Sequence, residues 1–226
     1  MACLFEAFDR VRVVSLPERQ DRRRGIARQL RGVAFEFFDA YRVSGPGLFR
    51  KAGSFGCYLS HLQVLSEAAL RNESVLILQD DCTFRPEAYD YEVPQCDIFY
   101  GSHAADGSCI IGAHCMGFSA SAARLAKDYL LALLDPNAPP DPAAKTEPGF
   151  DPSIRPPIDG ALVWFRRAHP DLTTAFAHLA DQRRSRSDVT PSRVDRLPVL
   201  REAVRLTRWL VPSNPHPATF DSRAQA

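Results

Sequence analysis

Two adjacent carboxylates follow an unbroken apolar run near the middle of the chain. Residues 74–78 read Ser-Val-Leu-Ile-Leu, which is typical of a strand buried on both faces, and Gln79, Asp80 and Asp81 come directly after it. Ligands of open α/β sheets bind outside the carboxyl ends of the strands. Two neighbouring carboxylates repel each other, and they stay ionised most easily when a cation lies between them and a ligand phosphate. The pattern therefore indicates a site for Mg²⁺ or Mn²⁺ with a phosphate; the alternative is a surface turn, where Asp is common.

The elements that would position this site alternate along the chain between strand and helix patterns. Apolar and β-branched runs predict strands at 11–16, 35–38, 74–78, 97–100 and 115–119. Helical spacing of apolar residues predicts helices at 18–31, 54–71, 119–134, 160–166 and 196–211. Ser54 and either Ser119 or Ser121 are the expected N-caps, and Asn72 is expected to end the second helix. This alternation predicts an α/β fold with a mostly parallel, twisted sheet and helices on both faces.

Composition narrows the class of protein. The 226 residues carry 28 basic and 27 acidic side chains, a net charge of +1, and we expect no nucleic-acid partner. The six cysteines form no CxxC pair and no paired Cys/His spacing, so a zinc ribbon or finger is not expected. No apolar run reaches the roughly 18 residues of a membrane span. The first ten residues lack a basic segment followed by an apolar core, so we expect no signal peptide and a cytoplasmic protein with reduced thiols.

Charge is unevenly distributed along the chain. Residues 71–160 contain fourteen acidic and six basic side chains, whereas residues 1–31 contain eight arginines and four acids. Residues 183–208 are again basic, with eight arginines and three acids. An acidic middle between basic ends suggests an acidic site that faces arginines and holds a cation and a phosphate together. The alternative is that these charges lie on solvated faces of separate helices.

Seven short motifs are distributed over about residues 11–190. They are Val14–Arg19 with Arg22 and Arg23, Gly53–His61, Val75–Asp81, Asp97–Tyr100, Met116–Ser119, Pro157–Asp159 with Leu162, and Ser185–Val189. In content and order they resemble the blocks of glycosyltransferase family 25, the lipooligosaccharide-type sugar transferases. The resemblance implies a single GT-A-like domain over residues 1–190. It also implies transfer of a hexose, often galactose, from a UDP-sugar to a saccharide or glycolipid hydroxyl, with inversion at the anomeric carbon, as in lipopolysaccharide biosynthesis.

The resemblance also implies roles for individual residues. Asp81 and Asp159 would be catalytic, with Asp159 binding the acceptor or acting as its general base. The donor nucleotide would be bound by Arg19, Arg22, Arg23, Ser60, His61, Gln79 and Asp80. A Mn²⁺ or Mg²⁺ ion would be held by Asp80, Asp81 and Asp188.

Some of these roles have structural alternatives. Ser60 and His61 could instead be a capped, hydrogen-bonded pair in the core, Asp159 could be the N-cap of helix 160–166, and Asp188 could form a surface ion pair. Gln79 stands where the family has Glu, which removes a charge and is expected to lower metal affinity or change the donor before it abolishes activity. Two other functions therefore stay open: a sugar-nucleotide-binding pseudoenzyme of the same fold, and a metal-dependent phosphoesterase or nucleotidyltransferase.

Two segments lie outside the expected regular elements. Residues 136–157 contain eight prolines, which predicts a loop and suggests a lid or acceptor-side flap. Residues 191–226 are predicted to form an amphipathic helix at 196–211 and a loose tail from 212. Arginines on one side of that helix and apolar residues on the other fit peripheral contact with an anionic membrane. They fit equally a helix that packs on the domain or on a second copy.

Overall fold

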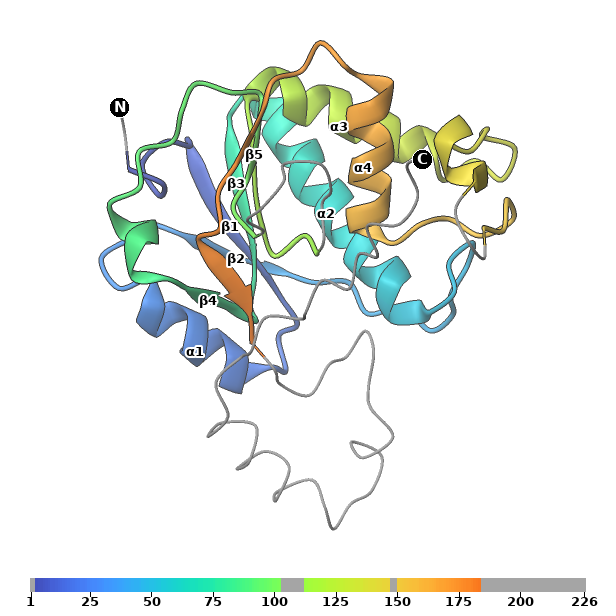
Figure 1. Cartoon of the computed structure of the whole chain (residues 1–226). Coiled ribbons are helices and arrows are strands. Elements are labelled where there is room, and N and C mark those ends of the chain that lie inside the picture. The colour runs from blue at the N-terminus through green and yellow to red at the C-terminus, as the bar shows by residue number, and fades with distance from the viewer. Residues whose placement is uncertain (1–2, 103–111, 147–149, 184–226) are drawn as a thin grey trace, which may run out of the picture.

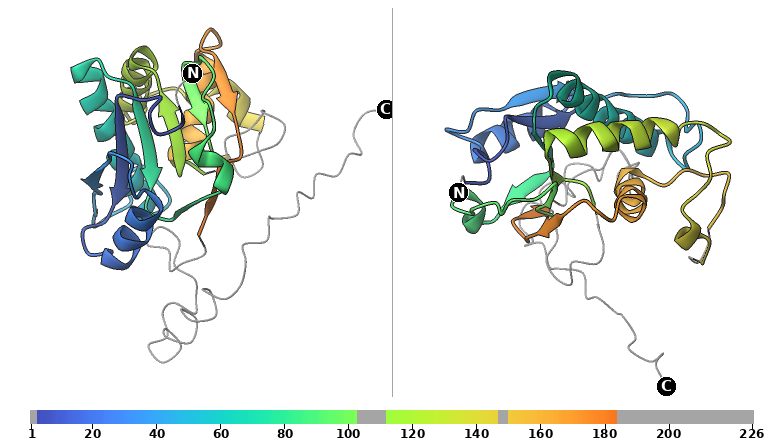
Figure 2. Two further views of the ribbon diagram at one scale, coloured as in Figure 1. Left: turned by 90° about the vertical axis from the view of Figure 1, so that its left-hand side faces the viewer. Right: turned by 90° about the horizontal axis from the view of Figure 1, so that it is seen from above.

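A six-stranded mixed sheet forms the centre of the protein (Figure 1). The computed structural model describes residues 3–102, 112–146 and 150–183. The strand order is β2-β1-β3-β6-β5-β7, and Figure 2 (left) shows the strands side by side from β1 in dark blue to β7 in orange. The strands are β1 (Arg10–Ser15), β2 (Glu36–Asp39), β3 (Val75–Gln79), β5 (Ile98–Tyr100), β6 (Cys115–Phe118) and β7 (Thr174–Phe176).

Most neighbouring strands of this sheet are parallel. β1 runs parallel to β2 and β3, and β5 runs parallel to β7. β6 is antiparallel to both of its neighbours, β3 and β5. A second, two-stranded antiparallel sheet joins β4 (Cys82–Phe84) to β8 (Ala180–Gln182). The predicted α/β class and the mostly parallel sheet are confirmed.

Helices cover both faces of the sheet, as the alternating pattern predicted. One core lies between the sheet and α2 (Ala52–Arg71), α3 (Ala120–Ala132) and α4 (Ile158–Ala168), which are on the right in Figure 1. The other core lies between the opposite face and α1 (Gln20–Gln29), together with β4 and β8. Side chains of β3 alternate between the two: Ile77 belongs to the first core and Leu76 and Leu78 to the second. This double burial explains the unbroken apolar run before Asp80.

Two of the expected helix ends are confirmed and one is wrong. Asn72 ends α2 in the left-handed conformation with φ of 54°, and Ser119 caps α3 by accepting a hydrogen bond from the Ala122 N–H at 3.2 Å. Ser54, however, lies inside α2, which begins at Ala52 after Lys51 without a side-chain cap. The other helices differ from their predicted bounds by a few residues at their ends, and β4, β7 and β8 were not predicted.

The proline-rich segment is tied to the fold at its C-terminal end. It contains only the short 3₁₀ helix η2 (Pro142–Thr146) among its described residues. The buried Arg155 guanidinium donates to the carbonyls of Asp135, Pro136 and Ala138 at 2.6, 3.2 and 3.0 Å, just beyond the end of α3. A cation at the carboxyl end of a helix also interacts favourably with the helix dipole.

Several predictions concern parts of the chain outside the described ranges. Asp188, the helix at 196–211 and the tail from 212 are among them. In the ranges that are described, no helix is both long enough and apolar enough to cross a membrane.

Candidate functional site

The carboxyl ends of β1 and β3 meet at the lower edge of the sheet in Figure 1, and the two predicted aspartates lie there. The Asp80 N–H continues the ladder by donating to the Val14 carbonyl at 3.2 Å. The Ser15 hydroxyl at the end of β1 donates to Asp80 Oδ2 at 2.6 Å. The parallel pairing of the two strands thus fixes the first carboxylate against the end of the neighbouring strand.

Arg22 of α1 bridges the two carboxylates. Its Nη1 lies 2.9 Å from Asp80 Oδ1 and 3.3 Å from Asp81 Oδ2. All three residues are buried, with exposed fractions of 8%, 6% and 8% for Arg22, Asp80 and Asp81. Burial raises the pKa of Asp80, and Arg22 and Ser15 oppose that rise by stabilising the charged form. One guanidinium is thus shared by two buried carboxylates, an arrangement that can accept a further cation.

Asp81 has one carboxylate oxygen that no residue of the described ranges contacts by a hydrogen bond. Its Oδ2 accepts from the Gln182 amide at 3.1 Å, and its backbone carbonyl accepts from the Arg183 N–H at 2.6 Å. Its Oδ1 is buried and has no hydrogen-bond partner within the described part of the chain. Buried polar atoms in folded proteins are almost always paired, so this carboxylate oxygen is a candidate for binding a ligand.

The aspartate pair fits a divalent cation only in part. Both oxygens of Asp80 are occupied by Arg22 and Ser15, so Asp81 Oδ1 is the carboxylate atom left for an ion. Among residues 3–102, 112–146 and 150–183, no three His, Cys, Asp or Glu side chains come together as a preformed metal site. Mg²⁺ and Mn²⁺ are often held by one or two protein ligands with phosphate oxygens and water completing the shell, and this arrangement is compatible with that mode.

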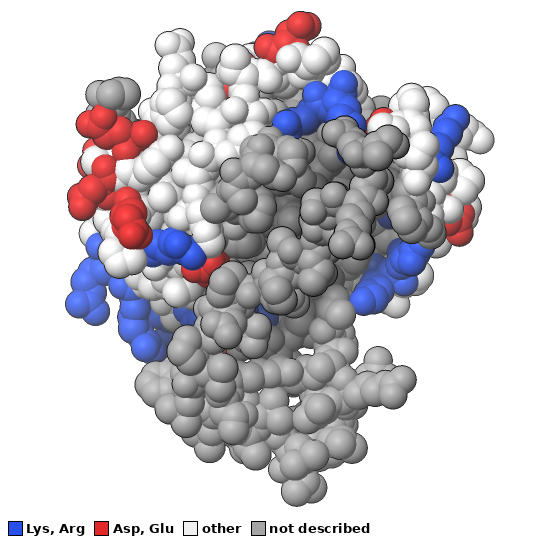
Figure 3. Space-filling view, in the orientation of Figure 1, with Lys and Arg blue, Asp and Glu red and all other residues white. Residues whose placement is uncertain are grey.

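The other two predicted arginines lie near the same edge but have other partners. Arg23 donates to the Ser15 carbonyl at 2.9 Å and to the Asp39 carboxylate, so it joins the ends of β1 and β2. Arg19 pairs with Asp21 at 3.1 Å. Figure 3 shows Lys and Arg side chains gathered at the lower left of the molecule, over α1. Arg22 is thus the arginine that bridges the aspartate pair.

Gln79 contacts a buried thiol. Its amide Nε2 donates to Cys57 Sγ on α2 at 3.6 Å. Burial raises the pKa of Cys57 to about 12, and the charges of Asp159, Asp81 and Asp80 add to the rise. The thiol is therefore neutral at physiological pH, which argues against a nucleophilic role. The same charges show that Asp159 lies within electrostatic range of the thiol that contacts Gln79.

Asp159 lies in the first turn of α4, and its interpretation as an N-cap is wrong. Pro157 occupies the N-cap position. The Asp159 carboxylate instead accepts a hydrogen bond from the Gly112 N–H at 3.2 Å. Gly112 has φ of +76°, a conformation that favours glycine, and it lies three residues before β6. This bond holds the start of α4 at the edge of the sheet where the Asp80–Asp81 pair is found.

Ser60 and His61 are engaged by the protein itself. The Ser60 hydroxyl donates to the Gly56 carbonyl at 2.7 Å and accepts from the Tyr41 N–H at 2.9 Å. The His61 ring lies between the carbonyls of Cys57 and Ala113, at 3.0 and 3.3 Å, and burial lowers its pKa. These contacts are those of buried, hydrogen-bonded core residues, which was the alternative to donor binding.

Three further residues belong to this edge and were not among the predicted site residues. Ser15 holds Asp80, Gln182 holds Asp81, and His114 lies just before β6. His114 Nε2 is 3.1 Å from the Ala180 carbonyl, while its buried Nδ1 has no partner among the residues described. Burial lowers the pKa of His114, although the Ala180 carbonyl and the charges of Asp81 and Asp181 oppose the shift.

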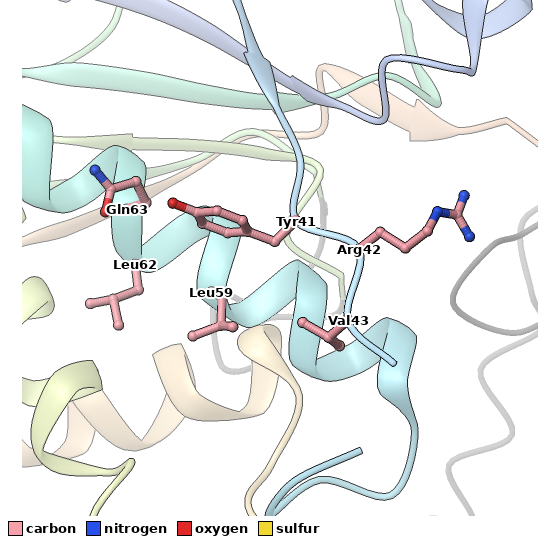
Figure 4. Close-up of a pocket in the computed structure, with 6 residues that line it drawn as sticks. All are labelled: Tyr41, Arg42, Val43, Leu59, Leu62 and Gln63. Atoms are coloured by element: carbon pink, nitrogen blue, oxygen red, sulfur yellow. The ribbon is translucent and has the colours of Figure 1, made fainter. Parts of the chain in front are cut away.

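A separate surface cavity of about 240 Å³ lies beside α2 (Figure 4). Its walls are Tyr41, Arg42 and Val43, which follow β2, and Leu59, Leu62 and Gln63 of α2. Arg42 is held at the rim by an ion pair with Glu18, whose carboxylate is 2.8 Å from the arginine Nε. None of the predicted site residues lines this cavity, so its chemistry is independent of the aspartate pair.

No protein-family model and no curated protein matches the chain.

Proposed function

We propose that the protein is a glycosyltransferase with a GT-A-like fold. It transfers a hexose from a UDP-sugar to a hydroxyl of a saccharide or glycolipid, a function that both the motif pattern and the site chemistry support. The motifs that resemble family 25 include the block Val75–Asp81, which contains β3, and the segment around Asp159. Both converge on one sheet edge, through Asp80–Asp81 and the Asp159–Gly112 hydrogen bond.

One observation carries the proposal: Asp81 Oδ1, which is buried and unpaired within the described ranges. A buried oxygen of this kind is costly unless a ligand completes it, and a cation bound to a diphosphate is the ligand that the surrounding charges favour. Mn²⁺ or Mg²⁺ would there neutralise the leaving diphosphate as a Lewis acid.

The side chains of the chain have distinct roles in this proposal. Arg22 holds both carboxylates and supplies positive charge beside the leaving group. Asp159 accepts the proton of the attacking hydroxyl, and a general base of this kind contributes roughly 10²–10⁴-fold in rate. Ser15 and Gln182 keep Asp80 and Asp81 in place. Peripheral attachment through residues 196–211 would bring a lipid-linked acceptor to the site.

The test is binding of UDP and UDP-hexoses by calorimetry, with and without Mn²⁺, followed by an assay of sugar release or transfer. We expect binding that Mn²⁺ strengthens in the natural protein and not in Asp81→Ala. Asp128→Ala is the matched control, because Asp128 is an exposed carboxylate on α3 that pairs with the neighbouring Lys127. Absence of affinity for any nucleoside diphosphate sugar, with or without divalent ion, would remove the proposal.

A pseudoenzyme that binds the sugar nucleotide without turnover is the second candidate. Two observations favour it. Arg22 bridges both aspartates directly. Gln79, which stands where the family has Glu, donates a hydrogen bond to Cys57. Binding without sugar release or transfer over a panel of donors and acceptors would support it. Transfer above the rate of the Asp81→Ala variant would exclude it.

A further inference from the structure

His114 is a further buried residue at this edge, and its Nδ1 has no hydrogen-bond partner among the described residues. Its side chain is 5% exposed, and it precedes β6, whose start faces the end of β3. The backbone of the same residue completes the edge, since its carbonyl accepts from the Gln79 N–H at 3.0 Å. His114 is thus joined through its main chain to the residue that precedes Asp80.

The hydrogen bond to Ala180 determines which atom of the ring is available. A carbonyl oxygen can only accept, so the contact of 3.1 Å places the ring proton on Nε2. In the neutral ring, Nδ1 then carries a lone pair and no proton. An atom of this kind binds a cation or a hydroxyl donor, and it does not bind a phosphate oxygen.

The same arrangement is typical of histidines that bind metals. A metal-ligating imidazole almost always donates its other N–H to a carboxylate, a backbone carbonyl or a water, which fixes the orientation and tautomer of the ring. The Ala180 carbonyl supplies that partner here, and it belongs to β8, which is itself paired with β4.

Asp81 and His114 are held by the same short strand. The Gln182 amide donates to Asp81 Oδ2, and Ala180, two residues earlier in β8, accepts from His114 Nε2. The two side chains lie within electrostatic range of each other. Gly112 lies beside the ring, and a Cβ atom at that position would come within 3.1 Å of Nδ1. A glycine at this position therefore keeps a side chain from crowding Nδ1.

We infer that His114 Nδ1 is a ligand of the divalent cation together with Asp81 Oδ1, and that the site therefore prefers Mn²⁺ to Mg²⁺. The preference follows because an imidazole nitrogen is a softer ligand than a carboxylate or a water and stabilises transition-metal ions more than Mg²⁺. The inference rests on the proposed function for the diphosphate oxygens that would complete the shell, and it names a protein ligand that the sequence motifs do not include.

The experiment measures Mn²⁺ binding directly, by electron paramagnetic resonance of free Mn²⁺, in the full-length protein with and without saturating UDP. We expect His114→Ala to weaken Mn²⁺ binding by about tenfold or more and to change Mg²⁺ binding much less. His169→Ala is the matched control: that residue lies after α4, where its ring is 3.0 Å from the Phe165 carbonyl, and its loss should leave Mn²⁺ binding unchanged. Equal Mn²⁺ affinity in His114→Ala and the natural protein would overturn the inference.

A measurement on the natural protein avoids dependence on the folding of the variant. With isotope-labelled histidine, Mn²⁺ should broaden the ring signals of His114 first among the six histidines, and uniform broadening would contradict the inference. The outcome for the proposed function is separate. Binding of UDP with a Mn²⁺ affinity independent of His114 would overturn the inference alone. Mn²⁺ binding that depends on His114, in a protein with no affinity for UDP-sugars, would overturn the proposed function alone.

Discussion

The two ends of the sheet use the same kind of side-chain pair in different ways. Before β1 and β3, Asp9 accepts hydrogen bonds from both the N–H and the hydroxyl of Ser74, each at 2.7 Å. Before β5 and β7, Asp97 accepts from the N–H and hydroxyl of Thr173 at 2.9 and 2.8 Å. At the opposite end of β1 and β3, Asp80 also accepts from a serine hydroxyl, but it is followed by Asp81, whose Oδ1 is unpaired among the described residues.

This difference in hydrogen bonding distinguishes carboxylates that stabilise the fold from a carboxylate that the fold leaves partly unsatisfied. Hydrogen bonds to Ser74 and Thr173 lower the pKa of Asp9 and Asp97, so their charged forms stabilise the protein. Burial raises the pKa of Asp80, so its charged form is held at a cost in stability. A site kept at such a cost is typical of function, because binding and catalysis require groups that the fold leaves unsatisfied.

Removal of Arg22 should have the largest effect on stability. Arg22→Met leaves two buried carboxylates without their common counterion, and loss of one partner from a buried ion pair costs about 3–5 kcal/mol. The free energy of unfolding in urea measures this loss. Arg24→Met on the exposed side of α1 is the control and should change it by less than about 0.5 kcal/mol. A loss of similar size in both variants would show that Arg22 does not offset the free-energy cost of burying the two aspartates.

Asp81 and Asp97 should give opposite results when each is replaced. Asp81→Asn is expected to lower transfer activity by about 100-fold, through loss of charge at the leaving group, with unfolding free energy unchanged within about 1 kcal/mol. Asp97→Ala is expected to lose about 1–2 kcal/mol of stability with activity unchanged within about twofold. Measuring both quantities on both variants tests the comparison, and equal activity in Asp81→Asn would reject the site.

The sequence predicted the central sheet better than its boundaries and its smallest strands. The apolar run before Asp80 and the helical spacing in residues 54–71 are long enough to show their period, and both elements are present, the helix with two further residues at its start. β4, β7 and β8 have three residues each, which is too short for an alternating pattern to be distinguished from a loop. Ser54 was misplaced as a cap because α2 begins two residues earlier without any side-chain cap.

The site was predicted where it depends on strand ends and was missed where it depends on contacts between distant segments. Asp80 and Asp81 were found because a buried strand ends there. Ser15 and Gln182 are separated from them by about 65 and 101 residues in sequence, and β8 itself gave no signal. The sequence contained His114 but nothing that showed its Nε2 directed at Ala180. Such contacts arise from the packing of two sheets, so no periodic pattern in the sequence predicts them.

The two ends of the sheet should also differ in the pH dependence of stability. The pKa of Asp97 lies below its ordinary value of 3.8, so its stabilisation is complete above that pH and disappears as pH falls through the lower, folded pKa. The penalty of Asp97→Ala should therefore shrink with acidification below about pH 4. The pKa of Asp80 lies above 3.8, so the natural protein loses stability as pH rises from that value through the folded pKa.

Asp80→Asn removes that titration. Its stability relative to the natural protein should therefore rise with pH over the same interval, with a slope of at most about 1.4 kcal/mol per pH unit. Unfolding curves in urea between about pH 3 and 6 give both slopes. Slopes of the same sign in the two variants would contradict the contrast between the ends.

Gln79→Glu should have the smallest effect of these changes. Gln79 is half-buried at the end of β3, and its side-chain amide donates a long hydrogen bond of 3.6 Å to Cys57 Sγ. Loss of this side-chain donor should therefore change the free energy of unfolding little. A carboxylate at this position adds negative charge beside Asp80 and Asp81, which favours a divalent cation. We therefore expect Mn²⁺-stimulated activity to stay the same or rise by a few-fold, with Gln63→Glu on the outer part of α2 as the control. A large loss of activity would mean that Gln79 itself binds the substrate, and the carboxyl end of the sheet would then differ from the amino end in more than its unpaired carboxylate.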